Sequence, residues 1–162
     1  MCPAILPTPD LQAASNYAPA LAAQLKALYD QGDAILALPV DFTKADAAVL
    51  YTVPTGIRLQ LGRAFWEITA SWTGGASSAI GLSSSNASYS TKGDLLGGAS
   101  GDVAAGLTFV APLFKGTIGA KAASQGVIVL VAGDTIRFDR ITSAFTAGTG
   151  LAHVPVQLLP AS

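Results

Sequence analysis

The chain has 162 residues, of which 51% are hydrophobic and only 12% are charged, and its net charge is −1. An ordinary soluble domain has roughly 25% charged residues, so this chain has few groups with which to solvate a surface. The lack of excess positive charge argues against a nucleic-acid partner, because phosphate neutralisation needs a basic surface. The longest aliphatic run, residues 127–132, is far shorter than the roughly 20 residues that cross a bilayer, so no membrane partner is predicted.

The simplest interpretation of this composition is that much of the surface faces other protein, as in a subunit of an assembly. Cys2 is the single cysteine, which excludes an internal disulfide and fits assembly in a reducing interior. The first ten residues lack a basic region and are interrupted by prolines, so we expect no signal peptide.

Residues 1–33 are predicted to form an N-terminal arm followed by a helix. Three prolines within nine residues hold residues 1–16 extended. The apolar residues of this arm have no local core, so we expect the arm to be mobile in the free protein and ordered against a neighbouring subunit. The alternative is a frayed terminus. The predicted contact residues of the arm are Pro3, Ile5, Leu6, Pro7 and Leu11.

Residues 17–31 are predicted to form the one helix of the chain. Ala and Leu, which favour helices, predominate here. Pro19 suits the first turn, and Gly32 provides the end of the helix. The large apolar residues share one helical face; they are Leu21, Leu25, Leu28 and Tyr29.

From about residue 34 the sequence predicts strands. Short apolar runs occupy residues 34–38 and 47–53, and a richer stretch covers residues 57–72. In this stretch the large apolar residues alternate on odd positions before Gly62 and on even positions after it, with Phe65 as the exception. A period-2 pattern that shifts by one residue at a glycine predicts a bulge or a tight turn there.

After a short strand at residues 78–82, residues 83–106 are rich in Ser and Gly. A loop of this length is usually functional or partly structured. We predict a peripheral contact or exposed tip, whose deletion from Ser84 to Gly101 should leave the protein folded. Tyr89 is expected to be exposed and to contact a partner, and Leu95 and Leu96 could anchor one helical turn.

The remaining strands are predicted at residues 107–111, 126–132, 135–145 and 151–159, with turns at 133–134 and 147–150. The run from 126 to 132 is expected to be buried on both faces, and Pro155 favours an edge strand or a bulge. Short strands separated by glycine turns, without alternating helices, predict an all-β fold. We therefore expect residues 34–162 to form an antiparallel β-sandwich of the jelly-roll kind, with a core containing Trp66, Ile68, Ile128, Leu130, Ile136 and Phe138.

The residues available for catalysis are few, and we predict that the protein is not an enzyme. His153 is the only histidine and lies in an apolar strand, and Cys2 has no histidine near it in sequence. No catalytic, metal or cofactor site is predicted, because zinc alone would need several Cys or His ligands. Asp134 and Asp139 are too far apart on a strand to act as a glycosidase pair. Longer-range pairs with Glu67, Asp94 or Asp102 leave a small hydrolase as a further alternative.

Aromatic residues could instead form a sugar-binding face, although aromatic residues in strands are more often part of the core. Those considered are Tyr17, Tyr29, Tyr51, Tyr89, Trp66 and Trp72.

Two passages of the sequence carry a resemblance. One is Thr52-Val53-Pro54-Thr55-Gly56-Ile57 leading into Arg63-Ala64-Phe65-Trp66-Glu67-Ile68, and the other runs from Val131-Ala132-Gly133-Asp134-Thr135-Ile136 through Phe145-Thr146-Ala147-Gly148-Thr149-Gly150 to Val154-Pro155-Val156. Together they resemble the capsid decoration, or cement, proteins of tailed phages with a jelly-roll fold, over roughly residues 47–160. Residues 83–106 would be a variable insertion.

The resemblance implies a homotrimer on the outside of a phage head, bound to the major capsid protein and reaching neighbouring subunits with an extended arm. The location implied is the capsid surface of the virion, after assembly in the host cytoplasm. The function expected is stabilisation of the capsid by bridging its subunits. The alternative is a tail or fibre module that binds host glycan.

Overall fold

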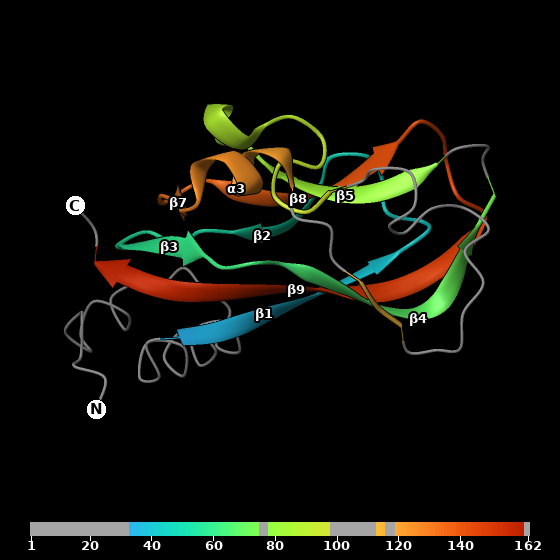
Figure 1. The fold of residues 1–162 in the computed structure, drawn as a ribbon, viewed down its shortest axis with the longest axis horizontal. Helices are drawn as coiled ribbons and strands as arrows, with labels where there is room; N and C mark the ends of the chain where they lie inside the picture. The colour runs from blue at the N-terminus through green and yellow to red at the C-terminus, as the bar shows by residue number, and fades with distance from the viewer. Residues whose placement is uncertain (1–32, 75–77, 98–112, 116–118, 161–162) are drawn as a thin grey trace.

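A computed structural model of the chain describes residues 33–74, 78–97, 113–115 and 119–160 (Figure 1). Its strands pair antiparallel and form two sheets packed face to face. The all-β antiparallel sandwich predicted from the sequence is thus confirmed. The elements are β1 (Asp33–Asp41), β2 (Ala48–Thr52), β3 (Ile57–Leu61), β4 (Phe65–Thr73), β5 (Ala79–Ser84), the 3₁₀ helix η1 (Ala87–Tyr89), β6 (Leu113–Lys115), α3 (Ala120–Gln125), β7 (Ile128–Leu130), β8 (Thr135–Ile141) and β9 (Ala147–Pro160).

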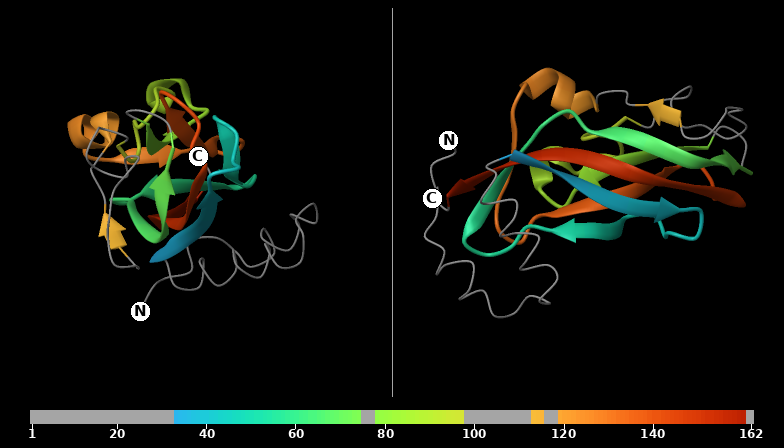
Figure 2. Two further views of the ribbon diagram at one scale, coloured as in Figure 1. Left: turned by 90° about the vertical axis from the view of Figure 1, so that its right-hand side faces the viewer. Right: turned by 90° about the horizontal axis from the view of Figure 1, so that it is seen from below.

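The large sheet is organised around β9, its longest strand. β1 pairs with one side of β9, while β3 and then β4 pair with the other side. β7 and β6 lie beyond β3 and β4, and the small sheet has the order β2-β8-β5. β1, β9 and β4 run side by side across the large sheet (Figure 2). Going along the chain, β2, β5 and β8 belong to the small sheet and the other described strands belong to the large sheet, so the described chain crosses repeatedly from one layer of the sandwich to the other.

The core lies between the two sheets and is built by the alternation seen in the sequence. All six residues predicted for the core are buried. Trp72 also belongs to it, with its ring edge-to-face against Phe145 at 5.0 Å. Ala70, in contrast, is exposed because the register shifts between Ile68 and Ala70. Two sheets that each turn one face inward bury this apolar set without any disulfide.

The predicted break at Gly62 is confirmed. β3 ends at Leu61 and β4 begins at Phe65, so both strands pair with β9 on either side of a short interruption. The backbone N–H of Gly62 donates to the carbonyl oxygen of Pro155 at 2.8 Å.

The expectation of an edge strand at Pro155 is wrong, because β9 pairs on both sides, but the alternative of a bulge is confirmed: residues 61–65 have one residue more than the segment 153–156 that they oppose. The N and C=O of a strand residue point to the same side, so the nitrogen of Pro155 also faces the interruption, between Leu61 and Phe65. A proline therefore fits inside the most central strand, because no ladder donor is needed at that point.

Two further expectations are corrected. The run at 126–132 is not buried on both faces: β7 covers only Ile128–Leu130 at the edge of the large sheet, Val127 is 54% exposed and Val131 is also exposed. Residues 147–150 are not a turn but the start of β9, where they pair with β4. The chain turns earlier, between Ile141 and Ala147.

Several predictions fall outside the described residues. These are the arm with Pro3, Ile5, Leu6, Pro7 and Leu11, the helix at 17–31 and the strand at 107–111. The helix α3, between β6 and β7, was not predicted.

Candidate interaction surface

The large sheet turns one face to the core and the other to solvent, and we call the latter the outer face. On β1, Leu36, Leu38 and Val40 point into the core, while Ile35, which precedes Leu36, is 55% exposed on the outer face. The same alternation on β9 places His153 and Pro155 on the outer face. The outer face therefore consists of every second residue of the strands that position it.

An aromatic cluster lies on this face where β4, β6 and β9 meet. Phe65 and His153 are paired across β4 and β9, and their rings stack with centroids 4.9 Å apart and planes at 16°. The ring of Phe114, from β6, lies 6.4 Å from that of Phe65 and is 59% exposed. Nε2 of His153 is 2.7 Å from Oε2 of Glu67. We call these four residues, Phe65, Glu67, Phe114 and His153, the aromatic cluster.

The polar pair within the aromatic cluster can orient a ligand or a partner side chain. The carboxylate of Glu67 fixes the orientation of the imidazole, leaving its Nδ1 edge as a further hydrogen-bonding group. Among the described residues no group of three or more His, Cys, Asp or Glu could hold a metal ion. A flat apolar surface with one polar pair is suited to recognition.

A shallow groove of about 460 Å³ adjoins the aromatic cluster along β9, beside the start of β1 and the end of β3. Among the described residues no charged side chain lines it, and Ile35 is its most exposed large apolar residue. The lining residues are Ala34, Ile35, Gln60, Leu61, Gly62, Pro155, Val156 and Gln157. The outer face thus has two distinct regions, the groove and the aromatic cluster.

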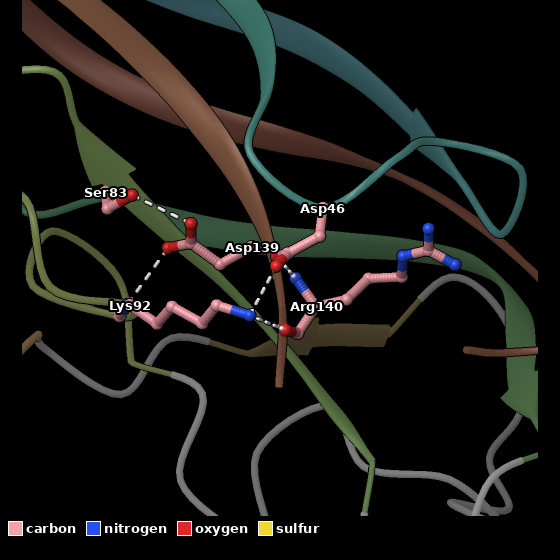
Figure 3. Close-up of polar contacts among 6 residues, drawn as sticks. Asp46, Ser83, Lys92, Asp139 and Arg140 are labelled. Atoms are coloured by element: carbon pink, nitrogen blue, oxygen red, sulfur yellow. Dashed lines mark hydrogen bonds and ion pairs between the residues drawn. The ribbon is translucent and has the colours of Figure 1, made fainter. Parts of the chain in front are cut away.

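Two of the carboxylates considered for catalysis, Asp139 and Asp94, are bound within the fold, and Figure 3 shows the contacts of Asp139. Asp139, on β8, is 2% exposed; its Oδ1 accepts from the hydroxyl of Ser83 at 2.8 Å and its Oδ2 from the N–H of Gly93 at 3.0 Å. Asp94 is also buried and accepts from the N–H of Thr91 at 2.9 Å. Each carboxylate caps local backbone or hydroxyl donors.

Burial raises the pKa of the Asp139 carboxyl, because a charged form in the core loses solvation. The hydrogen bonds from Gly93 and Ser83 oppose this rise only in part. The neighbouring Asp46 behaves differently. Burial alone would raise its pKa, but hydrogen bonds from Lys92 and from the N–H of Arg140 hold it below its usual value.

These contacts correct the prediction of an exposed loop for residues 83–84 and 93–97, which are buried, whereas most of residues 85–92 are exposed. Ser83 and Ser84 belong to β5 and are buried. The backbone of Leu96 bridges to Leu82 rather than forming a helical turn. Gly93 packs so closely on Gly81 that a Cβ at position 81 would lie 3.1 Å from its Cα. Residues 98–106 lie outside the described residues.

The expected exposure of Tyr89 is also wrong. It ends the 3₁₀ helix η1, which Asn86 caps by accepting from the N–H of Ser88 at 3.0 Å. This turn directs the phenol into the core, where it is 8% exposed. The other described aromatic residues considered for sugar binding, Tyr51, Trp66 and Trp72, are buried as well.

Sequence reasoning did not identify the aromatic cluster or the groove. Phe65 was the one signal available, since it is a large apolar residue on the polar side of an alternating strand. Phe114 and His153 come from other strands, so only the register between β4, β6 and β9 brings the three rings together.

Comparison of the chain with protein-family models, with curated protein sequences and with solved structures gives no match. Within the described ranges, no helix has the length and apolar character needed to cross a bilayer.

Proposed function

We propose that this chain is a structural virion protein that binds the outside of a phage capsid and stabilises it by bridging neighbouring capsid subunits. The observation that carries the proposal is the aromatic cluster on the outer face, where the ring of Phe114 is 59% exposed. Burying such surface contributes roughly 25 cal/mol per Å² before the costs of association. Repetition of the contact around a symmetric shell adds avidity.

The partners proposed are the major capsid protein and two further copies of this chain in a homotrimer. Cyclic symmetry closes such contacts without open-ended association. The aromatic cluster is the surface through which the folded domain is proposed to contact the capsid protein. The arm, with Ile5, Leu6 and Leu11, is the proposed anchor to a neighbouring subunit. The identity of the partner rests on the resemblance of the sequence to phage decoration proteins.

Electron cryomicroscopy of the native particle tests the proposal directly, because it shows whether the chain sits on a shell. Binding can be measured by mixing the protein with particles that lack it and heating them. The variant Phe114→Lys places a charge in the aromatic cluster and should abolish decoration. Val127→Lys, at an exposed residue of similar exposure near β7, is the matched control. Equal decoration by both variants would exclude the aromatic cluster as the contact.

The anchoring role of the arm has its own test. A chain that starts at Tyr17 should decorate such particles more weakly and protect them less against heating. If it protects them as well as the full chain, the arm is not an anchor. Sedimentation that finds only monomer at micromolar concentration would contradict the homotrimer.

A tail or fibre module that binds host glycan remains the second candidate, and the aromatic cluster is the observation that favours it. Exposed rings stack on the apolar faces of sugars, and a carboxylate with an imidazole can bind their hydroxyls. A glycan array probed with the protein and with Phe114→Ala separates the two candidates. Binding signals that disappear in the variant would support glycan recognition. An array on which the protein gives no signal would count against glycan recognition and favour the capsid function.

A further inference from the structure

The groove on the outer face is suited to bind an apolar segment of protein that would shield it from solvent. Its lining contains no charged residue, and it leaves Ile35 55% exposed at the edge of the large sheet. β1 pairs on one side only, with β9, among the described residues. A long, apolar edge strand is usually covered by a helix or a loop.

The chain itself supplies a segment at this place. β1 begins at Asp33, and its first residues, Ala34 and Ile35, line the groove. Thirty-two residues precede β1, and the last half of them carries the predicted amphipathic helix 17–31. Only Gly32 separates this helix from β1, and glycine readily adopts the conformation that reverses the chain.

We propose that residues 17–31 dock on the groove of their own chain, with Leu21, Leu25 and Leu28 facing Ile35 and Pro155. A helix of 15 residues is about 22 Å long, and a nine-residue strand such as β1 spans about 30 Å, so the helix fits along it. The helix is tethered to the sheet, so its effective concentration is in the millimolar range. A partner at micromolar concentration would displace it only by binding the groove about a thousandfold more tightly than the helix does.

This proposal is independent of the function proposed above, and it divides the outer face between two occupants. The groove is closed by the chain's own helix, while the aromatic cluster stays open for a partner. A helix layer against one end of the sheet also places residue 16, and hence the arm, at the margin of the domain rather than across its outer face.

Trypsin cleavage after Lys26 in the full chain provides the test, because proteolysis of a docked helix requires its local release. The variant Ile35→Gln should raise the cleavage rate about tenfold, because roughly half of Ile35 remains for the helix to bury and a tenfold change in an equilibrium corresponds to about 1.4 kcal/mol. Val49→Gln is the matched control, since Val49 is 57% exposed on β2 of the small sheet. Circular dichroism verifies that both variants fold.

A reciprocal measurement reports from the groove. In a Cys2→Ser, Gln157→Cys chain, the thiol should react with a maleimide slowly, and Leu25→Asp should accelerate the reaction at least tenfold. The same substitution should not affect a thiol placed at Val49.

Three results would overturn the proposal. One is equal cleavage of the Ile35 and Val49 variants. Another is a thiol at 157 that reacts at the same rate with and without Leu25→Asp. The third is protection of Lys26 that disappears on dilution to nanomolar concentration, which would mean that the helix docks on a second copy.

Discussion

Asp139 offers the sharpest test of how the fold holds residues 85–97 against the sandwich. Replacing it with alanine removes the acceptor of the Ser83 hydroxyl and of the Gly93 N–H. Each buried donor left unpaired costs about 1–3 kcal/mol, so we expect Asp139→Ala to lower the free energy of unfolding by about 2–5 kcal/mol. This is a large part of the stability of a typical domain.

Asparagine is the matched control for this substitution. Its Nδ2 can donate to the Ser83 hydroxyl and its Oδ1 can accept from Gly93, as a protonated carboxyl would. Asp139→Asn should therefore be within about 1 kcal/mol of the parent, or more stable at neutral pH, because it buries no charge.

The two proteins should also differ in their pH dependence. Burial raises the pKa of Asp139 in the folded state above its ordinary value of 3.8, so the folded state binds its proton more tightly than the unfolded state does. This contribution to stability is complete below the unfolded pKa and is lost as the pH rises through the folded pKa. Asp139→Asn should thus gain stability relative to the parent as the pH rises from 3.8 toward neutrality.

Urea unfolding of the three proteins between pH 4 and pH 8, followed by circular dichroism, measures these differences. Asp46 has a lowered pKa, so its contribution has the opposite sign and is lost as the pH falls. Asp46 is present in all three chains, so the comparison reports Asp139 together with its repulsion by the Asp46 charge. The reasoning would be refuted if Asp139→Ala lowered the free energy of unfolding by less than about 1 kcal/mol. It would also be refuted if the parent became more stable relative to Asp139→Asn as the pH rises.

One deletion and three substitutions test the packing and the surface. Deletion of Ser84–Gly101 should abolish cooperative thermal unfolding, because it removes buried side chains worth about 1.5–3 kcal/mol each; a cooperative transition would show that the segment is dispensable. Gly148→Ala should cost about 3 kcal/mol or more in urea unfolding, because its φ is +140° and a Cβ would lie 2.4 Å from the ring of Trp72. Gly133→Ala, with a φ of +88° and open space around it, should cost only about 1–2 kcal/mol, and equal losses would contradict the packing argument. Phe114→Ala should change the free energy of unfolding by less than about 1 kcal/mol but weaken binding to particles that lack the protein; unchanged binding would exclude the aromatic cluster as the contact.

The deletion reverses the expectation drawn from composition. Ser and Gly suggested a loop on the surface, but small side chains also permit close backbone approach. Gly81 and Gly93 meet in this way, and Ser83 supplies a short donor to a buried carboxylate. Composition alone could not distinguish these two uses, because the partner of each residue lies on another strand.

The sequence by itself determined the fold class and most of the core. Alternation placed Trp66 and Ile68 inward, and the shift at Gly62 located the break between β3 and β4. These features are local, since the direction of a side chain on a strand follows from the backbone period.

Only the tertiary structure decided which strands are central and which faces remain open. It placed Pro155 within the central strand, exposed Val127 at an edge and buried Tyr89. It also joined Phe65, Phe114 and His153 from three strands into one surface. Strand order and register are set by the packing of the whole chain, so no single segment contains the information that positions the interaction surface.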